Sequence, residues 1–340
     1  MEAPESYEKL GDWAIRHGET SLAVDLLLAG WERYPKHARL AYLAGLALSN
    51  AGSLGNASEI LDGVLPQLSA GNELLCDALS LRGRIAKEQW ARNPDTVAGE
   101  AALVDSAAYY LHAYEVSGSP YPAVNAASLS RLLGDRARSD ELARQVIDLC
   151  ITSKASQGEV SHWTYATLGE AHLLLGEERD AVREYSVAVE MAGDRIGDVV
   201  AMRRQVQRLE GALEVPEALH CVLDVGTVVV FTGHLIDRPE RRAPRFPSEL
   251  EGAARREIRK AVESLNARFG YCSLAAGGDI LFFEEMERRS AEINVFLPFG
   301  SESFRETCVE WAGSGWGDRF ARALASSEDR VQLTVKDEKA

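Results

Sequence analysis

The chain has 340 residues, of which 46% are hydrophobic and 26% are charged, a composition typical of folded proteins and a length that suits two domains. Its 52 acidic side chains outnumber the 37 basic ones, so the formal charge of −15 repels phosphate backbones and anionic membrane surfaces. General nucleic-acid binding and membrane association are therefore not expected, although a local cluster of arginines at 238–245 remains compatible with the negative total.

The N-terminus and the cysteines favour a reducing, cytoplasmic location. Residues 1–6 lack the basic start and the apolar core of a signal peptide, and no segment has the roughly 18 apolar residues needed to span a bilayer. The five cysteines are far apart and form no C-x-x-C pair near a pair of histidines. We therefore expect buried free thiols and no metal site.

The first two thirds of the chain contain an internal repeat of 34 residues, the length of a tetratricopeptide repeat. One copy begins at Pro4, a second follows after a shift of 34 residues, and a third clear copy begins at His162. Small residues stand where paired helices must touch, and a glycine near the fifteenth position of each copy turns the chain between them. These copies predict helix-turn-helix pairs.

Between residues 72 and 161 the copies are less clear, but amphipathic helices are predicted at 74–89, 101–114 and 139–149, with breaks at 93–94 and 118–120. Together with the clear copies they predict a tetratricopeptide-like α-solenoid over residues 1–214, whose concave surface binds a partner protein. Most aromatic residues at helical spacing in this region are expected to pack in the core, namely Trp13, Trp31, Trp90, Trp163 and Tyr165.

Three segments of the repeat region have a more particular sequence: 81–87 with Trp90, 121–127 with its Tyr-Pro-x-x-Asn-Ala-Ala order, and 162–171. Together they resemble the TRAFs-binding domain of the apoptosis signal-regulating kinases and its bacterial relatives, over roughly residues 1–213. The resemblance implies a regulatory platform for partner proteins. The kinase and thioredoxin-binding parts of that family have no counterpart here, so no kinase activity is implied.

The sequence changes character near Pro216, where helical periodicity gives way to an apolar run at 225–231 that predicts a buried strand. A polar segment rich in proline and arginine follows. Helices are then predicted at 249–269, 280–289 and about 303–326, alternating with strands at 271–276, 293–297 and 330–335. This alternation predicts a Rossmann-like, three-layer α/β domain over residues 218–340, with a parallel sheet and right-handed crossovers.

Ligands of parallel sheets bind at the carboxyl ends of the strands, where three loops of this domain are expected to meet. A glycine turn lets backbone N–H groups approach an anion, the following helix dipole attracts it, and arginine forks suit phosphate. The expected ligand-binding residues are therefore Thr232, Gly233, His234, Asp237, Arg242, Arg245, Ala276, Gly277, Gly278, Asp279, Pro298, Phe299 and Gly300.

Simpler interpretations of the same residues stay open. The Gly277–Gly278 pair is also explained by a tight turn with Asp279 as the N-cap of the next helix. His234 suits a structural hydrogen-bonded group, and the arginines suit a solvated charged loop.

The segment 271–299, with Ala276-Gly277-Gly278-Asp279 at its centre, resembles the SLOG superfamily, which includes the DNA-processing protein DprA and the LOG phosphoribohydrolases. The resemblance covers about residues 225–335 and implies a nucleotide-like ligand. The LOG motif is Pro-Gly-Gly-x-Gly-Thr-x-x-Glu; Gly277, Gly278 and Glu284 match its spacing, whereas Ile280-Leu281 replaces the Gly-Thr pair. That departure removes a phosphate-contacting turn, so Glu284 is catalytic only if the protein is an enzyme.

The segments 231–237 and 244–247 are also similar to bacterial proteins that combine a TRAFs-binding repeat region with such a sheet. The sequence therefore favours an intracellular signalling protein whose α/β domain binds a nucleotide or ADP-ribose-like ligand while the repeats bind a partner protein. Two alternatives are an N-glycosidic hydrolase of the LOG type and a scaffold whose α/β domain has lost its ligand. No cofactor is assigned, and self-association and a further C-terminal domain are left open.

Overall fold

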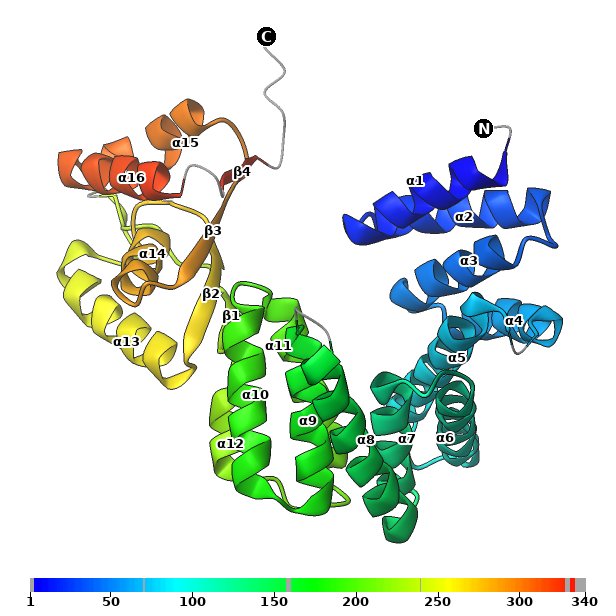
Figure 1. The fold of residues 1–340 in the computed structure, drawn as a ribbon. Coiled ribbons are helices and arrows are strands. Elements are labelled where there is room, and N and C mark those ends of the chain that lie inside the picture. Colours follow the sequence, from blue (N-terminus) through cyan, green and yellow to red (C-terminus); the bar gives the residue numbers. More distant parts are fainter. Residues whose placement is uncertain (1–2, 70, 157–159, 239, 328–330, 334–340) are drawn as a thin grey trace. The chain divides into compact units, whose positions relative to one another are not determined.

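The computed structural model describes residues 3–69, 71–156, 160–238, 240–327 and 331–333. Its contacts group residues 1–224 and 225–340 into two compact units, which we describe separately (Figure 1). Among the described residues no helix combines the length and the apolar character that a bilayer crossing requires.

The first unit is made of α-helices in consecutive antiparallel pairs, as the 34-residue period predicts (Figure 1). The three clear copies correspond to α1 (Pro4–Arg16) with α2 (Thr20–Arg33), α3 (Ala38–Asn50) with α4 (Leu54–Val64), and α9 (His162–Leu175) with α10 (Glu178–Ala192). The less regular part contains the 3-10 helix η1 (Leu65–Gln67), α5 (Glu73–Arg92), α6 (Val97–Ser117), α7 (Pro120–Leu132) and α8 (Arg136–Ser156). The unit ends with α11 (Ile196–Leu209) and α12 (Glu217–Val222).

Paired helices approach each other at a glycine of the first helix, which faces a large side chain of the second. Gly11 faces Leu27, Gly45 faces Leu61 and Gly169 faces Tyr185, each pair 16 residues apart, and Gly83 faces Tyr110 in the longer pair α5–α6. A Cβ atom at Gly169 would lie 2.5 Å from the Tyr185 ring. The repeated glycines therefore fix the distance between the helices of each pair.

The aromatic residues of this unit are less uniformly buried than the sequence predicts. Trp31 packs against the core, but Trp13 and Trp163 are exposed, the latter to 44%. Trp13 instead stacks on the ring of His17 one helical turn away, with ring centroids 4.4 Å apart. The prediction that these two tryptophans are core residues is wrong, because helical spacing does not reveal which face of an outer helix a neighbour covers.

The second unit contains a parallel sheet with the strand order β1–β2–β3–β4. Its strands are β1 (Thr227–Val230), β2 (Ala267–Cys272), β3 (Glu292–Leu297) and β4 (Val331–Leu333). Between them lie η2 (Ser248–Leu250), α13 (Glu251–Ser264), α14 (Gly278–Arg288), α15 (Ser301–Cys308), η3 (Glu310–Ala312) and α16 (Ser314–Ser326). The predicted parallel sheet is thus confirmed, and its core includes Ile280, Phe282, Val295 and Phe304.

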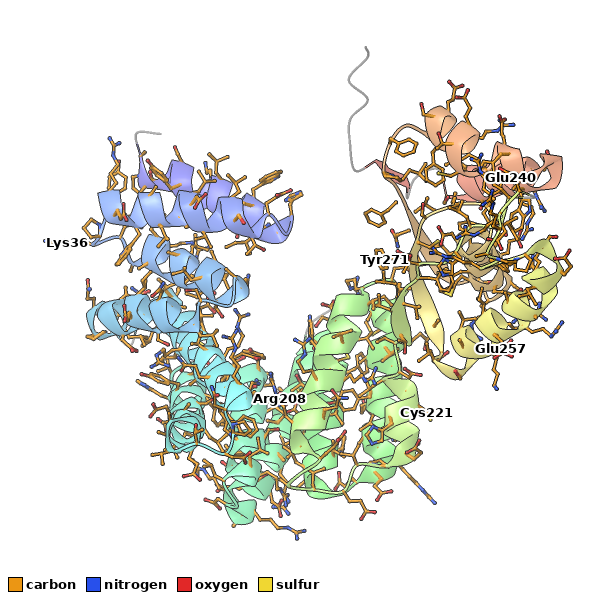
Figure 2. All side chains as sticks on the ribbon, turned by 180° about the vertical axis from the view of Figure 1, so that it is seen from behind. Lys36, Arg208, Cys221, Glu240, Glu257 and Tyr271 are labelled. Atoms are coloured by element: carbon orange, nitrogen blue, oxygen red, sulfur yellow. The ribbon has the colours of Figure 1, made fainter. Side chains whose placement is uncertain are left out.

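The prediction of a three-layer, Rossmann-like domain is not confirmed. Each new strand is added beside the previous one, so crossovers of one hand place their helices on one face of the sheet. There α14 contacts α13, α16, β2 and β3. Val228 and Val230 lie on the opposite face, where Val230 is 80% exposed and Tyr271 points away from the helices (Figure 2). Among the described residues of this unit, the sheet and helices form two layers.

The boundaries of α13 and β2 differ from the sequence prediction. The predicted helix runs to residue 269, but α13 ends at Ser264 and β2 begins at Ala267. Asn266 takes a left-handed backbone conformation with φ of 45°, which ends the helix. Phe269 consequently belongs to the sheet, where it pairs with Val228 of β1.

Replacing Gly169 with alanine should destabilise the repeat unit by about 2 kcal/mol, because the added methyl group overlaps the buried Tyr185 ring. Gly63→Ala is the matched control: Gly63 lies in α4 and nothing would lie within 4 Å of its added Cβ. That control should be neutral or gain up to about 1 kcal/mol of stability. Urea unfolding followed by circular dichroism measures both; equal stabilities of the two variants would contradict the role of the glycine contacts.

Candidate functional site

The loops that follow β1 and β2 lie against each other at the carboxyl ends of the strands. The Gly278 N–H donates to the His234 carbonyl oxygen at 3.0 Å, and the Ile236 N–H donates to the Ala276 carbonyl at 2.8 Å. Leu235 and Gly277 form an antiparallel bridge. The structure therefore brings together two of the three predicted site segments through backbone hydrogen bonds.

The Gly277–Gly278 pair is buried where these loops cross. A Cβ atom at Gly277 would lie 2.4 Å from the His234 carbonyl oxygen, and one at Gly278 would lie 2.9 Å from the Gly233 Cα. Gly277 also has a φ of 134°, which disfavours any other residue. The glycines thus allow two backbones to touch, and the Gly278 N–H is already hydrogen-bonded to protein. This geometry matches the tight-turn interpretation that the sequence left open.

Asp279 holds the first loop in place. Its Oδ1 atom accepts a hydrogen bond from the Gly233 N–H at 2.9 Å. Burial raises the pKa of this carboxyl, while backbone hydrogen bonds from Gly233 and Ala275 act in the opposite direction. The N-cap of α14 is Gly277, so the predicted capping role of Asp279 is wrong: its carboxylate binds the neighbouring loop instead.

Asp237 organises the arginine-rich loop. Its Oδ2 atom accepts hydrogen bonds from the backbone N–H groups of Arg245 at 2.7 Å and of Phe246 at 2.8 Å. Its Oδ1 atom lies 3.3 Å from the Nε of Arg241. Because Phe246 is part of the core, these bonds anchor the loop while the side chains of Arg242 and Arg245 stay exposed.

The other predicted site residues divide into exposed and packed groups. Thr232 and His234 are exposed beside the strand ends, as is Pro298 after β3. Phe299 packs against Phe304 with ring centroids 5.6 Å apart, and Gly300 is the N-cap of α15. The exposed polar groups available to a ligand are therefore those of Thr232, His234, Arg242 and Arg245, to which the sequence had added the buried glycine turn.

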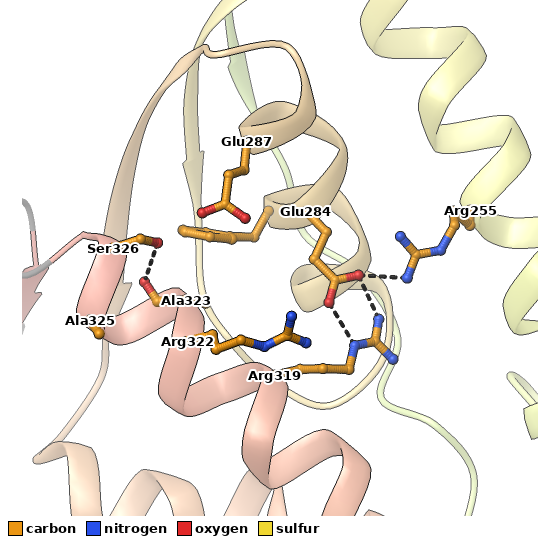
Figure 3. A pocket seen from close by; sticks show the side chains of 9 residues that line it. Arg255, Glu284, Glu287, Arg319, Arg322, Ala323, Ala325 and Ser326 are labelled. Atoms are coloured by element: carbon orange, nitrogen blue, oxygen red, sulfur yellow. Dashed lines mark hydrogen bonds and ion pairs between the residues drawn. The ribbon is translucent and has the colours of Figure 1, made fainter.

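Glu284 lies among the helices of this unit. Its carboxylate accepts two hydrogen bonds from Arg319, at 2.7 and 2.8 Å, and one from Arg255 at 2.5 Å (Figure 3). Partial burial would raise the pKa of this carboxyl, but the hydrogen bonds from the two arginines bring it below its usual value. A general acid at neutral pH needs a raised pKa, so this geometry does not suit proton donation to a leaving group.

Glu285 is the buried centre of the same ion-pair cluster, which the sequence analysis missed. Its side chain is 1% exposed and contacts the guanidinium groups of Arg259, Arg255 and Arg288, with atoms 2.8, 3.2 and 3.0 Å apart. The hydrogen bonds from Arg259 are the main reason that the pKa of Glu285 falls to about 2. The cluster connects α13 with α14, while Arg319 links α16 to it. The four-residue spacing of Arg255 and Arg259 is the sequence signal for it.

A cavity of about 860 Å³ opens beside this cluster. It lies between α14 and α16, with Glu284, Glu287, Arg319 and Arg322 in its lining (Figure 3). Charged side chains dominate the lining, and most of those near Glu284 are already paired with one another. The cavity therefore accompanies the contacts that hold the helices together.

Comparison with protein families supports the repeats. A family model described as Tetratricopeptide Repeats-Sensor matches residues 19–130, from α2 into α7. The chain thus contains tetratricopeptide-like repeats, a fold that serves protein–protein interaction. No curated protein matches the chain. The TRAFs-binding and SLOG resemblances receive no support from these comparisons and stay hypotheses.

Solved structures of repeat proteins are similar to part of the chain. A thermophilic tetratricopeptide-repeat protein of Thermus thermophilus, TTC0263, is 16% identical, with a TM-score of 0.47, over 60% of this chain and 100% of its own. The kinesin light chain-like repeats of Podosopora anserina are 15% identical, with a TM-score of 0.42, over 61% and 100%. The MamA protein is 14% identical, with a TM-score of 0.38, over 56% and 91%.

Replacing Glu285 with glutamine should destabilise the α/β unit by about 3 kcal/mol, because three arginines then lose their shared buried partner. Glu257→Gln, on the exposed side of α13, is the matched control and should change stability by less than about 0.5 kcal/mol. Hydrogen exchange of the α14 amides reports on this unit alone. Unchanged exchange in the Glu285 variant would show that the cluster adds nothing to stability.

The same carboxylate predicts an acid dependence. The pKa of Glu285 is about 2 in the folded protein, below its ordinary value of 4.5, so its stabilisation is complete above pH 4.5 and is lost as the pH falls through 2. The stability difference between the native protein and the Glu285→Gln variant should therefore shrink over that range. Exchange of α14 amides at a series of pH values measures it; a constant difference from pH 6 to pH 2 would refute the assignment.

Proposed function

We propose that this protein is a ligand-responsive interaction scaffold of the cytoplasm, in which the repeats bind a partner protein and the α/β unit binds a nucleotide-derived ligand. The observation that carries the proposal is the match of residues 19–130 to repeats described as a sensor. Stacked helix pairs offer an extended surface that suits a protein partner. The resemblance to TRAFs-binding domains points to the same use.

The exposed apolar side chains of the first helix pair support a protein partner. Leu10 and Trp13 of α1 and Leu22 of α2 are all exposed. Exposed large apolar groups that gather on neighbouring helices are typical of interaction surfaces. We infer that a partner covers this pair of helices.

Support for a ligand in the α/β unit comes from the loop that Asp237 anchors. The loop presents Arg242 and Arg245 to solvent close to the carboxyl ends of a parallel sheet, where ligands of such sheets bind. Guanidinium groups bind phosphate through paired hydrogen bonds. In this proposal the arginines and His234 contact the ligand phosphates, and the buried Gly277–Gly278 turn only fixes the shape of the loops.

A hydrolase of the LOG type is less well supported. Glu284, the carboxylate that such a reaction would use, is paired with Arg319 and Arg255, and the pKa of its carboxyl is lowered. Ile280-Leu281 also replaces the Gly-Thr pair of the LOG motif. Binding without turnover is therefore the better hypothesis.

A thermal-shift screen with ADP-ribose, NAD, AMP and cyclic nucleotides tests the proposal. One of these should stabilise the protein, and Arg242→Ala/Arg245→Ala should weaken that effect by about tenfold in ligand concentration, because two charge-assisted contacts are lost. Arg256→Ala, an exposed arginine on α13, is the control.

Chromatographic analysis of the same mixtures separates the alternatives. Release of a free base would show an enzyme and contradict the binding-only hypothesis. If no compound shifts the unfolding temperature, the α/β unit is a scaffold without a ligand.

A further inference from the structure

The repeat unit contains a cavity of about 640 Å³, a volume in the range that small-molecule sites occupy. It lies within the unit of residues 1–224 and is formed by helices from several repeats, namely α5, α6, α7, α9, α10 and α11. We name it the repeat cavity.

The three segments that stand out in the sequence of this unit meet in the repeat cavity. Segment 81–87 contributes Arg84 and Lys87, segment 121–127 contributes Tyr121, Val124 and Asn125, and segment 162–171 contributes Trp163, Thr164, Ala166, Thr167 and Glu170. These segments lie far apart in the sequence, so the unusual composition of each has a common spatial explanation.

The floor of the repeat cavity is a buried polar network. Lys87 is 7% exposed, and its Nζ donates to the Asn125 Oδ1 at 2.7 Å and to the Gln205 Oε1 at 3.1 Å. The Gln205 Nε2 donates to the Glu170 Oε1 at 2.7 Å, and the Ser128 hydroxyl donates to the same carboxylate. The network therefore joins α5, α7, α9 and α11.

Such a network is costly in a helical repeat, whose interior can be filled by apolar side chains. Burial, with a further contribution from Arg208, lowers the pKa of Lys87 to about 8, and burial raises the pKa of Glu170. Lys87 bonds neutral amides and has no direct hydrogen bond to Glu170 among the described residues. Departures of this kind from apolar packing mark functional sites.

Flat aromatic rings line the same cavity. Trp163 is 44% exposed and Tyr121 is 50% exposed, although both lie on helices that pack in the unit. Below them the Tyr110 hydroxyl is buried and forms no hydrogen bond of good geometry among the described residues, although the Tyr121 phenol is near enough to raise its pKa. The cavity thus combines ring surfaces with an unsatisfied polar atom.

The repeat cavity is basic within an acidic protein. Arg84, Lys87, Arg204 and Arg208 line it, against only Glu88 and Glu170. Glu88 pairs with Arg208 at 2.6 Å across α5 and α11, where Figure 2 labels Arg208. Glu170 is engaged by the network of the floor. The remaining positive charge favours an anion.

We propose that the repeat cavity binds a small phosphate ester that carries a planar ring, such as a nucleotide. The phosphate contacts Lys87 and the arginines, whose planar forks suit its oxygens, and the ring stacks on Trp163 and Tyr121. The ligand contacts helices of separate repeats and so stabilises one arrangement of them. This site is separate from the α/β loops and does not depend on a ligand there.

Isothermal titration with ADP as the probe tests the proposal on the full chain, in the native protein and in the Arg242→Ala/Arg245→Ala background. ADP should bind in both, because the repeat cavity lies in the other unit. Lys87→Met, Arg204→Ala and Trp163→Ala should each weaken binding by about tenfold, through a lost charge contact or a lost ring contact. Trp13→Ala removes an exposed tryptophan outside the cavity and should leave the affinity unchanged.

Arg204 is exposed, so its variant keeps the fold even if Lys87→Met does not. Adenosine and inorganic phosphate should each bind at least tenfold more weakly than ADP, since each offers only half of the contacts. Loss of ADP binding in Arg242→Ala/Arg245→Ala alone would place the ligand in the α/β unit and overturn the proposal. So would the absence of binding at millimolar ADP, phosphate binding as tight as that of ADP, or tighter binding of an acidic hexapeptide.

Discussion

A glycine of one helix facing a large side chain of the next sets the geometry of the repeat unit. Gly11, Gly45, Gly83 and Gly169 each receive a Leu or Tyr side chain from the partner helix, so the two helices lie close together over their whole length. Dispersion contacts and burial then stabilise each pair. Because each pair presents the same kind of surface to the next, the pairs stack, and residues far apart in sequence come to share one cavity.

The two units use polar side chains in opposite ways. In the α/β unit the arginines around Glu284 and Glu285 bind carboxylates, so nearly every charge near the centre of the cluster has a protein partner. In the repeat cavity Lys87 bonds only amides, and the positive side chains outnumber the negative ones. A satisfied cluster suits stability, whereas an excess of one charge in a cavity suits a ligand of the other charge.

Regular features of the fold could be predicted from the sequence, whereas features that depend on packing between distant segments could not. The 34-residue period located α1 to α4 and the pair α9–α10, because every copy keeps the same glycine and apolar positions. Alternating strands and helices predicted the parallel sheet, but strand order is set by packing, so the third layer was wrong. The Gly277–Gly278 turn suggested an anion site because its contact with Gly233 cannot be read locally. The repeat cavity brings together residues from 84 to 208, and only its sequence segments could be recognised.

Hydrogen exchange of the full chain with and without ADP tests most directly whether the repeats themselves receive a small ligand. Peptides that contain Lys87, Trp163 and Arg208 line the repeat cavity and should exchange more slowly when ADP is bound, whether or not the loop at 232–245 also changes. Unchanged exchange in all three peptides at saturating ADP would contradict a ligand site in the repeat unit.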